Sequence, residues 1–266
     1  MHYRTSVMTR ALLCQIPTPG YQRPTQFQLK IERDSSAMTS SPMPTPSVIS
    51  AVTGRKSVRG FKPDPIPLAL VRQILDEAAR APSGTNTQPW RVHIAIGAAK
   101  TRLSAAVTAA AQSGPQQHEY KYSPDELPEP YLSRRRKVGF DLYGIAGIAR
   151  GDLEGRKRQS LKNYSFFGAP VGLFFTMDCR MELGSWLDVG MFMQNVMTLA
   201  RGYGLETCPQ AAWIYYGPTV HQALGIPETE MLISGMALGH PDWTVAENAL
   251  ETERALSAEF AVVHDE

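Results

Sequence analysis

The sequence predicts one domain of mixed helices and strands, of the α/β or α+β class, over residues 48–266. Segments with the period of strands alternate along the chain with longer segments of helical period. The composition, 43% hydrophobic and 20% charged in 266 residues, is that of an ordinary globular protein. A balance of 27 basic to 25 acidic residues argues against a nucleic-acid partner. No apolar run approaches the roughly 20 residues that span a membrane, so no membrane partner is expected.

Residues 1–47 are expected to be a disordered tail or an extension ahead of the true start. The stretch 35–47 is small, polar and rich in proline, and cannot bury enough surface to order itself. Met38 and Met43 are candidate true starts. An organelle transit peptide is the alternative. A secretory signal is not expected, because these residues lack the apolar region that such a signal requires.

The first helices and strand are predicted from the spacing of apolar residues and from the position of a proline. A helix is expected from Pro67 to about Ala79, because proline suits the first helical position and apolar residues recur at helical spacing. Alternation from Val92 to Ile96 predicts a strand, and an alanine-rich helix follows over 98–112.

The later elements include two apolar strands, at 171–177 and 231–238. Between them lies a long helix, 186–200, which is apolar around much of its circumference and is therefore expected in a core or a subunit interface. A short helix over 218–224 ends at Gly225. The polar stretch 113–168 is expected to form a lid that contains a helix, because long insertions in compact domains are often functional.

Several common sites are excluded by missing motifs. The chain has no G-x-G-x-x-G, no G-x-x-x-x-G-K-[ST], no H-E-x-x-H and no G-x-S-x-G. Six scattered histidines indicate no metal site. The cysteines, Cys14, Cys179 and Cys208, lie far apart and predict no disulfide framework, which fits a reducing, cytoplasmic compartment.

Three segments carry candidate binding residues. Arg55, Ser57 and Arg59 alternate, so an extended backbone would present them on one side, where two guanidinium groups suit a phosphate; a solvated basic face is the alternative. The loop 82–90 is polar and bounded by prolines, as in a ligand loop or a capped turn. The segment 207–213 has small residues that would admit a flat ring, or it is a plain strand edge.

In this order the segments resemble the nitroreductase family of flavin enzymes. The matching motifs lie at residues 55–61, 81–90, 202–209, 224–227 and 235–242, and the resemblance extends over about 50–258. It implies an α+β, nitroreductase-like fold with a central, mostly antiparallel sheet flanked by helices. It further implies an intertwined homodimer with an FMN in each half of the interface.

The resemblance also implies which residues contact FMN. They are Arg55, Lys56, Ser57, Arg59, Pro82, Ser83, Gly84, Asn86, Gln88, Pro209, Gln210, Ala211, Ala212, Gly239, His240 and Arg254. Many members have Glu-Gly where this chain has Ala211-Ala212, so a backbone contact is expected there rather than a side-chain role. Arg59, and after it Lys56, is the candidate cation for the reduced flavin, and no catalytic residue is named.

The implied activity is an FMN-dependent oxidoreductase. NADH or NADPH and an oxidant, a nitroaromatic or a quinone, would take turns at the flavin in two-electron, ping-pong steps. Substrate contacts are expected from the lid residues Tyr131, Arg136, Phe140, Tyr143 and Phe166; the alternative is a lid core with a solvated arginine face. Reductive dehalogenation, flavin fragmentation and flavin binding without turnover remain open.

Overall fold

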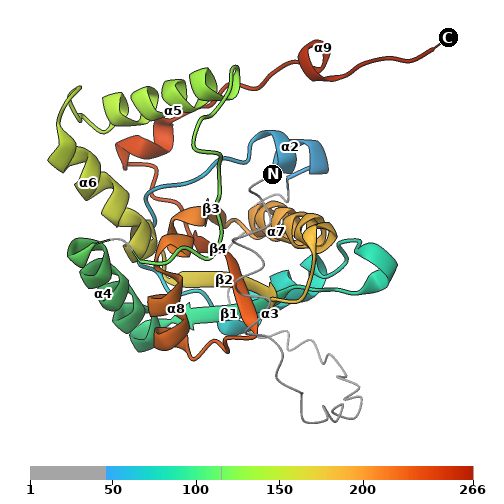
Figure 1. Ribbon diagram of the computed structural model, residues 1–266, viewed down its shortest axis with the longest axis horizontal. Coiled ribbons are helices and arrows are strands. Elements are labelled where there is room, and N and C mark those ends of the chain that lie inside the picture. Colours follow the sequence, from blue (N-terminus) through green and yellow to red (C-terminus); the bar gives the residue numbers. More distant parts are fainter. Residues whose placement is uncertain (1–45, 115, 266) are drawn as a thin grey trace, which may run out of the picture.

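A four-stranded antiparallel sheet forms the centre of the protein (Figure 1). The computed structural model describes residues 46–114 and 116–265. The strands are β1 (Arg91–Ile96), β2 (Val171–Asp178), β3 (Glu206–Gln210) and β4 (Glu230–Gly239), in the order β1-β2-β4-β3. The expected α+β class and antiparallel sheet are confirmed.

Helices cover both faces of this sheet. They are α2 (Val48–Thr53), α3 (Leu68–Ala78), α4 (Gly97–Ser113), α5 (Tyr131–Ile145), α6 (Leu153–Leu161), α7 (Leu183–Gly202), α8 (Gly217–Leu224) and α9 (Ser257–Phe260). Short 3₁₀ turns lie at η1 (Gly84–Asn86), η2 (Lys162–Gly168), η3 (Ala211–Tyr216) and η4 (Ala246–Ala249). Every helix and strand expected from periodicity is present, and α2, a second lid helix and α9 are additional; β3 lies where a strand edge was one of the two alternatives.

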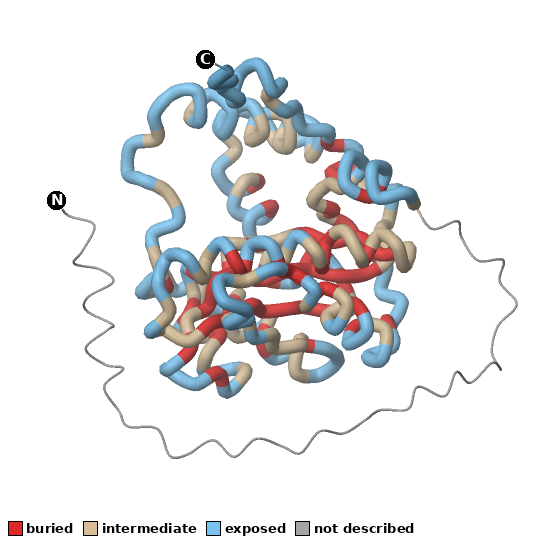
Figure 2. The backbone as a smooth tube through the Cα atoms, turned by 90° about the vertical axis from the view of Figure 1, so that its right-hand side faces the viewer, coloured by how far each residue is buried: buried red, intermediate tan, exposed pale blue. Residues whose placement is uncertain are grey.

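The two faces of the sheet carry separate apolar clusters. On one face, α3 and α7 pack against Leu173, Phe175 and Met177 of β2. On the other face, Phe174 lies among residues from α4, α8, η2 and η3. Successive side chains of a strand point to opposite faces, so β2 is buried along nearly its whole length (Figure 2). This double cover explains why β2 reads as a continuous apolar run.

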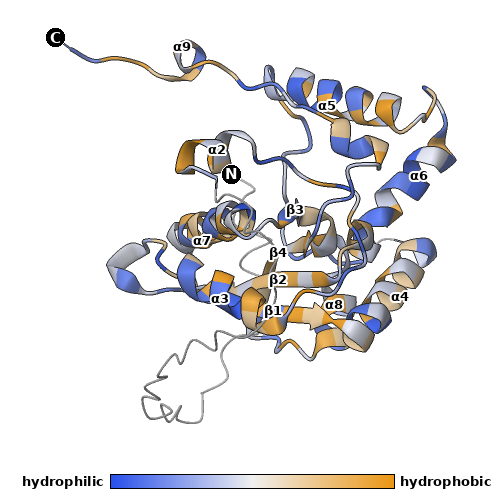
Figure 3. Cartoon of the chain, turned by 180° about the vertical axis from the view of Figure 1, so that it is seen from behind, coloured by the Kyte–Doolittle hydropathy of each residue, from blue (hydrophilic) through white to orange (hydrophobic). Residues whose placement is uncertain are grey.

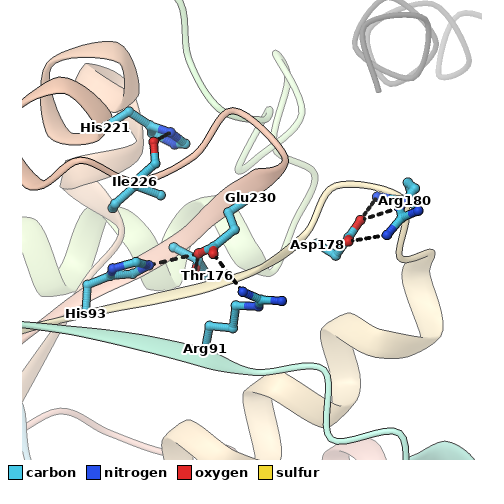
Figure 4. A network of polar contacts seen from close by, with 8 residues as sticks. All are labelled: Arg91, His93, Thr176, Asp178, Arg180, His221, Ile226 and Glu230. Carbon is cyan, nitrogen blue, oxygen red and sulfur yellow. Dashed lines mark hydrogen bonds and ion pairs between the residues drawn. The ribbon is translucent and has the colours of Figure 1, made fainter. Parts of the chain in front are cut away.

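One end of the sheet holds a buried polar network (Figure 4). Glu230, 4% exposed, accepts hydrogen bonds from Thr176 Oγ1, from His93 Nε2 at 2.8 Å and from Arg91 at 3.1 Å. Burial by itself would raise the pKa of Glu230, but these partners outweigh it and lower that pKa. The carboxylate therefore ties β1 and β2 to the start of β4.

Two parts of the chain stand away from the core. The lid helices α5 and α6 are largely polar, and residues 251–265 are exposed almost throughout (Figures 2 and 3). The expectation for residues 1–47 falls outside the described residues, apart from the last two. Within the described range, Cys208 is free and buried while Cys179 is disulfide-bonded, a single bond that the expectation of no disulfide framework did not include.

Two kinds of feature are absent from the described residues. None of their helices is long and apolar enough to cross a membrane. They also contain no group of His, Cys, Asp and Glu residues that could hold a metal ion.

Candidate cofactor site

The basic segment 55–59 is fastened between β3 and the C-terminal part of the chain. The Val58 amide donates to the carbonyl of Thr207 at 3.1 Å. The Arg59 amide donates to Asn248 Oδ1 at 2.6 Å, and Lys56 Nζ donates to the Asn248 carbonyl at 3.0 Å. Asn248 is 2% exposed and also donates to the carbonyl of Gly60. One buried amide side chain therefore holds the segment in place.

Positive charge accumulates beside this segment. Burial and the nearby charge of Arg254 lower the pKa of Arg55, with Glu206 opposing them. Glu206 is already paired with Arg201 Nε at 2.9 Å, and burial raises the pKa of its carboxyl. Arg55, Lys56 and Arg254 thus exceed the acidic charge around them, which suits a phosphate. Thr207 Oγ1 lies in the same region, buried and without a hydrogen-bond partner among the described residues.

Cys208 occupies the middle of β3, next to these cations, but it is not a nucleophile. Burial raises the pKa of its thiol to about 11, although Arg59 and Arg55 act in the opposite direction. A thiol that stays protonated is a poor nucleophile and a poor metal ligand. Cys208 therefore packs as a small apolar residue.

The polar loop 82–88 is strained and anchored to α7. Thr85, Asn86 and Gln88 have φ values of 48°, 61° and 48°, a region that side-chain-bearing residues rarely adopt. Two anchors hold it: Ser83 Oγ accepts from the Gln88 amide at 3.0 Å, and the Gly84 amide lies 3.3 Å from both carboxylate oxygens of Asp188. Strain that the surroundings over-determine is typical of functional loops.

The third segment, 207–213, can offer a ligand its backbone rather than its side chains. The Gln210 side chain is 2% exposed, donates to the Asn163 carbonyl at 2.8 Å and accepts from Trp213 Nε1 at 3.3 Å. It is therefore engaged within the protein, and a ligand could reach only the backbone at this position. Pro209, Ala211 and Ala212 are half-buried, as a surface against a flat ring requires.

The end of β4 meets the basic segment as well. Lys62 donates its amide to the carbonyl of His240 at 2.9 Å. Gly239 is buried, and a Cβ there would lie 2.7 Å from Pro170 Cδ. Close packing against Pro170 is thus enough to explain why residue 239 is a glycine, and no ligand contact is needed. His240 borders the site through its backbone.

The structure does not bring the loop 82–88 to the basic segment. The loop is fastened at Asp188, whereas Arg201 of the same helix donates to the Ser50 carbonyl just ahead of the basic segment. Thirteen helical residues separate Asp188 from Arg201, or about 20 Å along the axis. The predicted residues therefore form two groups: 55–59, 209–212, 239–240 and 254 on the side of the C-terminal end of α7, and 82–88 on the side of its N-terminal half.

The predicted lid residues do not lie together either. Arg136, Phe140 and Tyr143 line a groove of about 460 Å³ between α5 and α6, together with Arg156. Tyr131 is 56% exposed at the start of α5. The expectation for Phe166 is wrong: the residue is fully buried, and its ring packs against Trp213 with centroids 4.6 Å apart.

Sequence reasoning missed Asp188 and Asn248, the two residues that hold the loops. Asp188 had a signal, since a charged residue in an otherwise apolar helical stretch needs a buried partner. Asn248 had none, because its role depends on a turn that comes back to residues almost 190 positions earlier.

The chain is similar to known nitroreductases over most of its length. The model of the nitroreductase family matches residues 52–240. The chain is 39% identical to the chloronitrobenzene nitroreductase of Comamonas testosteroni, over 84% of this chain and 100% of that protein. It is 38% identical to a 4-nitrobenzoate reductase of Pseudomonas putida, over 79% and 92%.

Two solved structures are similar over most of their length. An FMN and NADPH-dependent nitroreductase, NfnB from Sphigopyxis sp. strain HMH, superposes with a TM-score of 0.80 at 39% identity, covering 82% of this chain and 99% of its own. The FMN-dependent nitroreductase NfnB from Mycobacterium smegmatis, in complex with NADPH, gives 0.78 at 30%, covering 82% and 97%.

Proposed function

The chain belongs to the nitroreductase family, and on that premise we propose that it is an FMN-dependent oxidoreductase that uses NAD(P)H to reduce nitroaromatic compounds. The observation that carries the proposal is the surplus of cations where the basic segment meets Arg254. These residues come from opposite ends of the domain, and they converge beside a strand whose small residues leave room for a ring.

The described residues fit FMN. Arg55, Lys56 and Arg254 would hold its phosphate, with the unpartnered hydroxyl of Thr207 close by. The backbone of 209–212 would border the ring. When bound there, FMN would supply the two-electron redox chemistry that links NAD(P)H to the nitro compound in a ping-pong reaction.

The chain's own residues would provide a fixed cation beside the cofactor and a neutral surface around it. Arg59 is half-buried, and its guanidinium is oriented by the Ser57 carbonyl at 3.2 Å. A fixed cation of this kind stabilises negative charge as it develops nearby. The thiol of Cys208 in β3 stays neutral beside these cations, because burial raises its pKa to about 11.

A homodimer completes the site in this proposal. The loop 82–88 is anchored at Asp188, whereas the stretch ahead of the basic segment is anchored at Arg201, about 20 Å further along α7, so one chain holds the two apart. The outer face of α7 exposes Leu183 (78%) and Leu187 (72%), and α2 exposes Val48 (78%) and Ile49 (75%). Apolar patches of this kind mark interaction surfaces, so the loop of each subunit would reach the basic segment of its partner.

A cytoplasmic location belongs to the same proposal, since the reaction needs a steady supply of NADH or NADPH. The nitroaromatic acceptor is a small-molecule partner.

An anaerobic visible spectrum tests the proposed function. Purified protein loaded with FMN should bleach with NADPH and regain its flavin band on addition of 4-nitrobenzoate or nitrobenzene. The double variant Arg55→Ala with Arg254→Ala should retain little FMN, whereas Arg102→Ala, on the exposed side of α4, should load normally. A flavin that bleaches and is not reoxidised by any nitroarene would contradict the acceptor. A protein that takes up no FMN would contradict the proposal as a whole.

A further inference from the structure

The cations of helix α5 form ion pairs on one face of the helix, whereas those on the other face form none with the described residues. On one face, Arg134 pairs with Glu259 at 3.6 Å, and Lys137 pairs with Asp141 at 2.8 Å and with Glu253 at 3.4 Å. On the other face, Arg135 and Arg136 line the groove toward α6. Among the described residues, no carboxylate lies within 4 Å of either groove arginine, although Glu129 is near enough for Arg136 to lower its pKa.

The groove adds aromatic rings and a further unpaired cation. Arg156 of α6 lies over the Tyr143 ring, 5.2 Å from its centroid, and Arg150 lies over Phe140 at the same distance. The Nε atom of Arg156 is buried and has no hydrogen-bond partner among the described residues. A second hollow of about 380 Å³ shares Phe140, Tyr143 and Arg156 and continues the groove. The groove thus offers flat apolar surfaces beside several guanidinium groups.

This chemistry suits an aromatic ring that carries a multiply charged anion. Guanidinium groups bind phosphate oxygens bidentately, and aromatic side chains stack on flat heterocycles. The lining residues are all in the lid, and none belongs to the segments 55–59, 82–88 or 209–212. A compact acceptor that reacts at the flavin would therefore not fill the groove, whereas the far end of an elongated ligand could.

The groove is also suitably placed for such a ligand. Glu253, the partner of Lys137 on the opposite face of α5, directly precedes Arg254 of the cation cluster. Only the width of one helix, about 10 Å with side chains, thus lies between the groove and that cluster. An extended dinucleotide with its nicotinamide at the flavin could reach this far.

Resting on the proposed function, we infer that the α5–α6 groove binds the adenosine 2′-phosphate of NADPH and makes the enzyme prefer NADPH to NADH. Arg135, Arg136 and Arg156 bind the phosphate, and Phe140 and Tyr143 stack on the adenine. NADH lacks only that phosphate, so the groove discriminates between the two donors.

Binding without turnover tests the groove directly. Calorimetry on the full-length, FMN-loaded protein should show that adenosine 2′,5′-bisphosphate binds roughly tenfold more tightly than adenosine 5′-monophosphate. The double variant Arg136→Ala with Arg156→Ala should lose this difference. A matched control, Arg134→Ala with Arg158→Ala, removes one arginine from each of the same helices outside the groove and should keep it.

Steady-state kinetics provide the second readout. In the groove variant the KM for NADPH should rise roughly tenfold, while kcat and the KM for NADH stay within twofold of the wild type. Equal binding of the two adenosine phosphates by the wild type would overturn the inference. So would a groove variant that raises the KM for 4-nitrobenzoate, but not for nitrobenzene, and leaves NADPH unaffected, since the groove would then serve an anionic acceptor. A protein without reductase activity would instead contradict the proposed function, and calorimetry would still decide the groove.

Discussion

Asp188 is a carboxylate on the apolar helix α7, and its only described partner is the amide of Gly84. It is 7% exposed. A buried carboxylate needs hydrogen bonds to offset its desolvation, and the loop beside it needs an anchor because three of its residues have strained backbones. The hydrogen bond between the Gly84 amide and the Asp188 carboxylate satisfies both requirements. The residue that shapes the loop thus lies behind it and need not touch a ligand.

Removing this carboxylate should loosen the loop and weaken FMN binding. We expect Asp188→Ala to raise the Kd for FMN by about tenfold or more, because a hydrogen bond to a charged group contributes about 1.5–3 kcal/mol. Asp188→Asn keeps one acceptor and should have a smaller effect. Quenching of flavin fluorescence measures the Kd. Equal affinities in all three proteins would show that the loop does not depend on this anchor.

Glu230 gives a prediction about stability rather than cofactor binding. Because the folded pKa of Glu230 is lowered, its contribution is complete above the ordinary value of 4.5 and is lost as the pH falls through the folded value. Glu230→Gln should reduce the free energy of unfolding by about 1–2 kcal/mol at pH 7, a modest amount because Arg91 is mostly exposed.

The difference between Glu230→Gln and the wild type should shrink as the pH falls below 4.5. Urea unfolding at pH 7 and at pH 4 or lower measures it. Thr229→Ala, at the neighbouring position outside the described side-chain contacts of the network, is the control. A difference that stays constant with pH would contradict the assigned charge state.

At the scale of elements, η2 and β2 depend on each other. Phe166 and Phe167 of η2 have φ values of 55° and 53°, and the Phe166 ring lies over Gly172 of β2, where a Cβ would overlap it. The aromatic group of Phe166, Phe174 and Trp213 thus closes one face of the sheet only because the strand carries a glycine there. This packing removes Phe166 from the lid and places it in the core.

A methyl group at this position should therefore be costly. We expect Gly172→Ala to lower the free energy of unfolding by about 1–3 kcal/mol, as overpacking of a filled core does. Gly144→Ala on α5 is the control, because a Cβ there meets nothing within 4 Å and alanine favours a helix. Thermal or urea denaturation compares the two, and an unchanged Gly172→Ala protein would mean that the aromatic group rearranges freely.

At the scale of the whole molecule, the single chain leaves much apolar surface uncovered. Apolar side chains are exposed on α2 and on the outer face of α7, and the tail 251–265, which extends away from the body of the molecule (Figure 1), exposes Phe260, Val262 and Val263 by 70%, 78% and 79%. Burial of such surface contributes about 25 cal/mol per Å². The proposed dimer would bury it and bring the two groups of flavin contacts together.

Charge placed on this face should separate the subunits. We expect Leu187→Glu to shift the protein toward monomer in analytical ultracentrifugation and to reduce its FMN content with it. Leu153→Glu on α6 is matched in residue type and exposure, 71% against 72%, and should remain a dimer with FMN. A Leu187→Glu protein that stays dimeric and fully loaded would exclude α7 from the interface.

Most of the helices and strands could be predicted from the sequence, and the resemblance of its motifs to a known family predicted the cofactor. Helical and strand periods are local, so α3, α4, α7, β1, β2 and β4 could be read from short windows. The basic segment and the proline-bounded loop could be predicted as candidate binding segments, because the motifs that resemble the family are each contained within about ten positions.

How these pieces meet depends on contacts between segments that are far apart in the chain. The tertiary structure placed Asn248 against Arg59, Asp188 under Gly84 and Phe166 in the core, contacts that join distant positions or opposite faces. It also engaged the Gln210 side chain within the protein and held the loop 82–88 apart from the basic segment. Local patterns cannot contain this information, because the partner of a buried polar group is set by packing between elements that are far apart in the chain.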